Sequence, residues 1–239
     1  ICSDKTGTLT QNKMTVTKLY TYGELKDIAD INIMDRDVEL ALKIGLLCND
    51  AIIEEYNGEK KPLGDPTEVA LVVAAQQHRL FKKEQEAILE RVKEIPFDSD
   101  RKLMTTIHKT DKGYKILTKG ALDILMDKCT GILINGNVQR LTTDMKKTIN
   151  KVNENLSQQA LRVIALAYKD TSKDHNSLKN DYAEQDLIFV GMFGMIDPPR
   201  QEARIAVAKC KEAGIKPVMI TGDHKVTAMA IAKELGILN

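Results

Sequence analysis

The spacing of apolar residues changes along this chain, and the change limits the folds that it can adopt. Over residues 102–117 and 132–141, apolar and polar residues alternate around two turn signals, Asp111-Lys112-Gly113 and Asn135-Gly136. This pattern is typical of antiparallel hairpins. After Asp197-Pro198-Pro199 the order becomes helix, strand, helix, which indicates a parallel α/β sheet. The chain is therefore expected to contain both kinds of sheet.

Local periodicity predicts the remaining elements. Apolar residues at helical spacing predict helices over 38–47, 68–78, 82–91, 121–129, 143–159, 201–213 and 224–235. Alternating or continuous apolar runs predict strands over 13–22, 102–109, 114–117, 161–167, 187–194 and 215–221. Gly131 is expected to cap the helix before it, and the polar residues 169–185 are expected to form a surface loop.

Composition excludes several classes of protein. The chain has 239 residues, 43% of them hydrophobic, enough to fill one large core or two modest ones. Lysine and arginine number 35 against 34 acidic residues, so the net charge of +1 gives no support for binding nucleic acid. The four cysteines are far apart and away from the histidines, which argues against zinc and favours reduced core thiols. The most apolar run, Leu187 to Ile196, is too short to cross a bilayer.

The segment Asp4-Lys5-Thr6-Gly7-Thr8-Leu9-Thr10 has the residues needed to handle phosphate. Asp4 can act as a nucleophile, the threonines supply hydroxyl and N–H donors, and Gly7 permits close approach. Lys5 adds positive charge. An ordinary turn after a strand is the alternative, since the same residue types are common there.

These residues resemble the phosphorylation motif of the P-type ATPases, cation pumps that form an aspartyl-phosphate. Further motifs of that family follow in its order: Cys48-Asn49-Asp50, Gly64-Asp65-Pro66-Thr67-Glu68, Pro96-Phe97-Asp98-Ser99-Asp100-Arg101-Lys102, Lys119-Gly120-Ala121, Asp197-Pro198-Pro199-Arg200 and Thr221-Gly222-Asp223. The form of the third motif looks most like that of the calcium-type pumps. Ser99 departs from it, because related calcium pumps often have arginine there.

The resemblance and the change of period together predict an insertion. Residues 1–12 and 198–239 are expected to form part of a parallel-sheet phosphorylation domain of the haloacid-dehalogenase type. Residues 13–197 are expected to form an inserted α+β nucleotide-binding domain with an antiparallel sheet. Ligands of open α/β sheets sit at the carboxyl ends of the strands, so the Asp4 turn and the Thr221-Gly222-Asp223 turn should lie at one edge.

The resemblance assigns the transfer chemistry to Asp4, Lys5 and Thr6, with Asp4 attacking the γ-phosphate of ATP. It implies Mg²⁺ at Asp4 and Thr6, with further ligands expected beyond this segment. Phosphate would be bound by Thr6, Gly7, Thr221, Gly222 and Asp223, although Asp223 could instead be only a helix N-cap. In related dehalogenase-type phosphatases the position of Thr6 is typically a second Asp. Threonine cannot act as a general base there, so a long-lived acyl phosphate is expected.

The nucleotide site is expected in the inserted domain, at Glu68, Phe97, Lys102, Lys119, Gly120 and Arg162. The resemblance implies that Phe97 stacks on adenine, that Glu68 contacts the adenine amino group, that Lys119 lies at the pocket floor and that Arg162 reaches the phosphates. Gly120 would allow the chain to approach the ligand closely. The alternatives are a core phenylalanine and charges that are merely solvated.

The expected function is therefore that of the ATP-binding and phosphorylated part of a cation pump, with ATP and Mg²⁺ as cofactors. Its expected partners are the transported cation and the actuator and transmembrane domains of the same protein, at the cytoplasmic face of a membrane. The segment is expected to be an excised fragment that binds ATP without turnover. A soluble phosphatase and a non-catalytic nucleotide-binding module are the alternatives.

Overall fold

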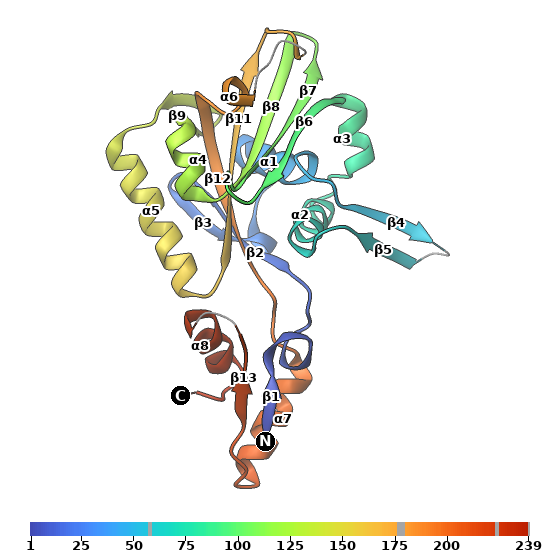
Figure 1. The fold of residues 1–239 in the computed structure, drawn as a ribbon, viewed down its shortest axis with the longest axis vertical. Coiled ribbons are helices and arrows are strands. Elements are labelled where there is room, and N and C mark those ends of the chain that lie inside the picture. The colour runs from blue at the N-terminus through green and yellow to red at the C-terminus, as the bar shows by residue number, and fades with distance from the viewer. Residues whose placement is uncertain (57–58, 176–179, 223–224, 239) are drawn as a thin grey trace.

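A larger and a smaller part, connected by neighbouring stretches of chain, make up the molecule (Figure 1). The computed structural model describes residues 1–56, 59–175, 180–222 and 225–238. Among these residues the larger part contains a nine-stranded sheet covered by helices. The smaller part holds both ends of the chain and consists of parallel strands β1 (Cys2–Asp4) and β13 (Val218–Ile220), helices α7 (Gln201–Glu212) and α8 (Lys225–Glu234), and the tight turn η1 (Lys5–Leu9).

The large sheet runs in the order β10-β9-β12-β11-β8-β7-β6, and β2 pairs with both β12 and β3. Its neighbouring strands are antiparallel, except that β9 and β12 are parallel within the described residues. Its strands are β2 (Thr15–Thr21), β3 (Glu24–Asp27), β6 (Arg91–Asp98), β7 (Leu103–Thr110), β8 (Gly113–Gly120), β9 (Cys129–Ile134), β10 (Asn137–Arg140), β11 (Arg162–Thr171) and β12 (Leu187–Ile196). The expected antiparallel sheet is confirmed.

Helices bury both faces of this sheet. In β11, Leu166 and Tyr168 pack in the core shared with α1 (Arg36–Leu47) and α2 (Pro66–Gln77), whereas Ala165 and Ala167 pack in the core shared with α4 (Leu122–Lys128) and α5 (Thr143–Gln158). Successive side chains of a strand point to opposite faces, so a strand covered on both sides must be apolar at every position. This explains the continuous apolar run of β12, which lies between β11 and β2.

Two predicted boundaries are wrong. Helix α3 (Lys82–Ile88) ends before Arg91, which instead starts β6 opposite His108 of β7. Gly131 does not cap α4, because the chain passes directly from that helix into β9, where Gly131 lies opposite Arg140 of β10. In both cases pairing with a neighbouring strand overrides the local signal.

The predicted surface loop over residues 169–185 is only partly a loop. Strand β11 continues to Thr171, opposite Tyr114, and α6 (Asn180–Ala183) follows the residues left undescribed. Ala183 and Glu184 are buried, and the buried Lys169 ammonium donates to the carbonyls of Tyr182 and Gln185. Lys169 and Glu184 can be buried because Lys169 donates to carbonyls and Glu184 pairs with Arg101.

The hairpin β4 (Ile52–Tyr56) and β5 (Glu59–Leu63) was not predicted, nor were β3 and the short turn η2 (Ile28–Asp30). The hairpin projects beside α2 (Figure 1). Glu54 lies opposite Lys61 in its register, and Ile52 opposite Leu63. Ile52 and Leu63 are 42% and 41% exposed. Burial therefore does not impose apolar alternation on this pair, and periodicity does not reveal the hairpin.

Within the described part of the chain, no helix combines the length and the apolar character required to cross a membrane.

His108 of β7 is fully buried and held in its neutral form. Its Nδ1–H donates to the Leu89 carbonyl at 2.9 Å, so Nε2 accepts from the Thr106 hydroxyl at 2.8 Å. Burial, which disfavours the charged ring, lowers the pKa of His108 to about 4 from its usual 6.5. The folded chain therefore binds fewer protons than the unfolded chain between these two pH values.

We expect this histidine to reduce stability in acid. The free energy of unfolding should fall as pH drops through 6.5 toward 4, because the unfolded chain gains a proton that the folded chain does not. Between pH 7.5 and pH 5 the loss due to His108 should be about 2 kcal/mol. Urea unfolding of His108→Gln, compared with the original chain at both pH values, should show that this part of the pH dependence is gone. His175→Gln, at a partly exposed histidine, is the control; an identical pH dependence in all three proteins would contradict the assignment.

Candidate functional site

A cavity of about 300 Å³ opens between helix α2 and strands β6, β7, β8 and β11. It is lined by Asp50, Asp65, Thr67, Glu68, Leu71, Phe97, Met104, Lys119, Gly120, Arg162 and Ile164. The predicted nucleotide residues Glu68, Phe97, Lys119, Gly120 and Arg162 thus lie in one cavity, although they are spread over almost a hundred positions of the sequence. Leu71, Met104 and Ile164 form its apolar wall and continue into the core beneath α1 and α2.

The start of helix α2 places Thr67 and Glu68 in this cavity. Asp65 is the N-cap and accepts from the Thr67 backbone N–H at 2.8 Å, and Pro66 occupies the first turn. Gly64 before it has φ +128°, and a Cβ there would lie 2.8 Å from the Ala51 backbone. Only glycine fits this close crossing, so the Gly-Asp-Pro-Thr-Glu order follows from the geometry of the helix start. The Arg162 guanidinium donates to the Thr67 hydroxyl at 2.8 Å.

An ion pair forms the floor of the cavity. Lys119 Nζ lies 2.6 Å from Glu68 Oε1, and the two side chains are 10% and 16% exposed. The other carboxylate oxygen, Oε2, accepts from the Asp50 backbone N–H at 3.1 Å. The floor is therefore polar, ordered and locally neutral.

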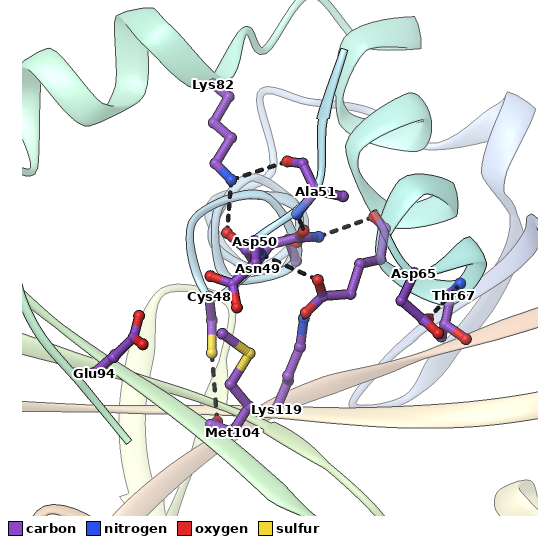
Figure 2. Close-up of polar contacts among 12 residues, drawn as sticks. Cys48, Asn49, Asp50, Ala51, Asp65, Thr67, Lys82, Glu94, Met104 and Lys119 are labelled. Atoms are coloured by element: carbon purple, nitrogen blue, oxygen red, sulfur yellow. Dashed lines mark hydrogen bonds and ion pairs between the residues drawn. The ribbon is translucent and has the colours of Figure 1, made fainter. Parts of the chain in front are cut away.

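The Asp50 N–H belongs to a hydrogen-bonded loop, residues 49–51, that follows α1 (Figure 2). The buried Asn49 amide donates to the carbonyls of Gly45 and Glu68, both at 2.9 Å, and its Oδ1 accepts from Ala51 N–H at 2.8 Å. One side chain thus ties the end of α1 to the start of α2. The adjacent Cys48 is buried and donates its thiol to the Met104 carbonyl at 3.4 Å, and burial raises its pKa.

Phe97 lies at the rim of the cavity with 62% of its surface exposed. The Asp98 carboxylate accepts two backbone N–H groups of the turn that follows. The Arg101 guanidinium donates to the Pro96 carbonyl and pairs with the buried carboxylate of Glu184. These contacts hold the backbone on both sides of Phe97 while its ring stays largely exposed.

Lys102 is the predicted nucleotide residue that is not among those lining the cavity, and it is exposed. Its backbone has φ +53°, and its carbonyl accepts from Ala121 N–H at 3.1 Å. A Cβ on Gly120 would lie 2.2 Å from that carbonyl. Gly120 is therefore required by the crossing of two backbone segments at the cavity wall.

Asp4 is the last residue of β1 and pairs in register with Ile220 of β13. Because the strands are parallel, the turns that begin at Lys5 and at Thr221 leave from the same end. The expectation that they share one edge is confirmed for the described residues; Asp223 lies outside them. Asp4 and Thr6 are exposed, and Gly7 has φ +77°, which favours glycine. Lys5 is buried.

Polar contacts join the connecting stretches between the two parts. The Thr10 hydroxyl donates to Asp197 Oδ2 at 2.6 Å, and Asp197 Oδ1 accepts from the Lys13 backbone N–H at 3.1 Å. The Arg200 guanidinium donates to the Thr10 carbonyl at 2.9 Å and to the Gly7 carbonyl at 3.2 Å. The Asp197-Pro198-Pro199-Arg200 segment thus contacts the Asp4 turn directly.

A second cavity, of about 550 Å³, lies where the two parts meet. Its lining includes Lys5 and Thr227 of the smaller part, and Met14, Arg162 and Met195 of the larger. Arg162 lines both cavities, and the second cavity also includes Lys5 of the Asp4 turn. Arg162 therefore lies between the Phe97 cavity and that turn.

Sequence reasoning left some lining residues without a role. Asp50, Asp65 and Thr67 belong to motifs that were noticed but were given no place in the site. Lys82 does not line the cavity, but its ammonium donates to the carbonyls of Asn49 and Ala51. The sequence held no signal for it beyond a charged helix. In the described residues no three His, Cys, Asp or Glu side chains form a group that could hold a metal.

Comparison with known proteins identifies the family. The family described as "P-type ATPase, cytoplasmic domain N" matches residues 37–202. Calcium-transporting ATPase 1 of Bacillus cereus is 49% identical over 99% of this chain and 26% of its own length, and calcium-transporting ATPase 1 of Lactococcus lactis is 44% identical over 100% of this chain and 27% of its own. The sodium/potassium-transporting ATPase alpha subunit of Tetronarce californica is 35% identical, again over 100% of this chain and 26% of its own length. The chain spans about a quarter of the length of these curated relatives. It belongs to the P-type ATPase family.

Proposed function

We propose that this chain binds ATP in the Phe97 cavity and accepts its γ-phosphate on Asp4. The observation that carries the proposal is the convergence of Glu68, Phe97, Lys119, Gly120 and Arg162 on one cavity of about 300 Å³. An exposed aromatic ring and an ion pair that line the same cavity offer a stacking surface and polar groups together, which suits a nucleotide base.

In this proposal the adenine base stacks on Phe97 and its amino group donates to Glu68. Lys119 stays paired with Glu68 at the floor and can also donate to the ligand. Arg162 binds the phosphates, since a guanidinium is suited to phosphate oxygens. Its place between the cavities supports a path for the phosphate chain toward Lys5 and Asp4. The exposed Lys102 would reach the nucleotide only from outside the cavity wall.

At the Asp4 turn a carboxylate oxygen attacks the γ-phosphorus in line, the bond to the β–γ bridging oxygen breaks, and ADP leaves. We assign the binding of the phosphoryl oxygens to the N–H and hydroxyl groups of Thr6, Gly7, Thr221 and Gly222, and we assign Asp223 to the same set. Exposed Asp4 and Thr6 offer oxygen donors of the kind that Mg²⁺ takes together with substrate phosphates. When bound there, Mg²⁺ would offset the negative charge around the phosphoryl group.

We assign residues 1–12 and 198–239 to part of a phosphorylation domain of the haloacid-dehalogenase type, and residues 13–197 to the inserted nucleotide-binding domain. The parallel pair β1–β13 with α7 and α8 supports the first assignment, although a two-stranded sheet is only the beginning of such a domain. The large sheet, which spans residues 15–196, supports the second.

For the full-length protein we propose an ATP-driven cation pump, with calcium as the transported ion. The names of the bacterial relatives support the ion. The cation site would then lie in a transmembrane domain, with this chain and an actuator domain at the cytoplasmic face. Alone, the chain would bind ATP, whereas transfer of the γ-phosphate to Asp4 would take place in the full-length protein.

We predict that Phe97→Ala weakens ATP binding about tenfold, because base stacking is worth about 1–3 kcal/mol. Calorimetric titration of ATP into the 239-residue chain measures the effect. Phe81→Ala is the matched control, since Phe81 is also partly exposed, at 40%, but does not line the cavity. Equal losses in both variants, or no loss in either, would refute the pocket.

We predict that Asp4→Asn, made in the full-length protein, abolishes the phosphorylated intermediate, because an amide cannot form the acyl phosphate. The intermediate is measured as acid-stable, hydroxylamine-sensitive incorporation of labelled phosphate from ATP. Asp123→Asn, at an exposed residue of α4, is the control and should leave incorporation unchanged. Labelling that persists in the Asp4 variant would place the phosphate elsewhere.

A further inference from the structure

Lys82, the first residue of α3, has a largely buried side chain that does not line the Phe97 cavity. Its side chain is 11% exposed, and Nζ donates to the carbonyls of Asn49 at 2.6 Å and Ala51 at 3.0 Å (Figure 2). Glu86 of the same helix lies 4.0 Å away, at the limit of an ion pair. Burial lowers the pKa of Lys82. Withdrawing an ammonium from water is costly unless it is hydrogen-bonded, and the two carbonyls offset that cost. What remains to be explained is why a charged group is used at this position.

The contacts lead to the floor of the Phe97 cavity. Lys82 grips the 49–51 loop on either side of Asp50, and the Asp50 backbone N–H, between the two gripped carbonyls, donates to Glu68 Oε2. Asn49 holds the same loop from within, through its bond to the Glu68 carbonyl. The direction of one N–H, and with it the orientation of the Glu68 carboxylate, therefore depends on how the loop is held.

Glu68 is held from both sides. Lys119 takes Oε1, and the loop takes Oε2. If the loop turns, the carboxylate can still pair with Lys119, but it can rotate about that contact. The carboxylate would then stay in the cavity, but the direction of its free lone pairs would no longer be fixed.

We propose that Lys82 is a positioning residue for base recognition: by fixing the 49–51 loop it orients Glu68 to accept from the amino group of adenine. This rests on the proposed function, in which Glu68 reads the base. Guanine has a carbonyl oxygen where adenine has that amino group, so a correctly oriented Glu68 favours ATP over GTP. Lys82 thus contributes to selectivity without touching the nucleotide.

The test is Lys82→Met in the 239-residue chain, with ATP and GTP affinities measured separately by calorimetry. Methionine keeps the apolar length and removes the donors. We expect ATP affinity to fall about fivefold, as for loss of one supporting hydrogen-bonded contact, and GTP affinity to stay within about twofold. Lys83→Met, at the exposed neighbouring lysine, is the control and should change neither. Lys82→Arg, which keeps charge and donors, should retain most of the ATP preference. If Lys82→Met does not fold, Lys82→Gln is measured in its place.

A double-mutant cycle separates positioning from general destabilisation. In a Glu68→Gln background Lys82→Met should cause no further loss of ATP affinity, whereas in a Phe97→Ala background its fivefold effect should remain. Equal weakening of ATP and GTP, persistence of the effect without Glu68, or no effect of Lys82→Met would each overturn the proposal. Failure of Phe97→Ala to weaken ATP would instead overturn the proposed function, so the two failures are distinguishable.

Discussion

The ion pair between Glu68 and Lys119 is the contact on which the candidate site depends. It joins the first turn of α2 to the end of β8, where the core beneath α1 and α2 gives way to the cavity. Two charges with so little exposure are tolerable because each neutralises the other and Glu68 accepts a further N–H. Removing one partner would leave a buried, uncompensated charge, which is far more costly than losing the pair. The pair therefore holds both the helix start and the cavity floor in place.

Most of the fold could be predicted where burial is strong. The apolar run of β12 and the periodic helices α1 and α5 were placed within a few residues. A strand buried on both faces leaves a continuous apolar run, and a helix buried on one face leaves apolar residues at helical spacing. The failures lie at the ends of elements and in the exposed hairpin. Arg91 and Gly131 sit where strand pairing decides the conformation, and the β4–β5 hairpin buries too little to leave a pattern. Backbone pairing of this kind involves no side-chain code.

The site divides in the same way. Family motifs brought out Glu68, Phe97, Lys119, Gly120 and Arg162, and the structure places them together. The residues that hold them were not predictable. Lys82 acts through carbonyl oxygens, and Glu184 reaches the Phe97 turn through Arg101, across a long separation in sequence. No sequence pattern accompanies either contact, because a lysine or glutamate that makes such a contact cannot be told from one that is solvated.

The register of β2 and β12 has a structural consequence of its own. Thr15, the first residue of β2, lies opposite Ile196, the last of β12, so the large sheet is entered and left at adjacent points. The carboxylate of Asp197 ties the flanking stretches together just outside them. A unit whose two ends meet in this way can be accommodated in a host fold without stretching that fold, because both connections leave from neighbouring points.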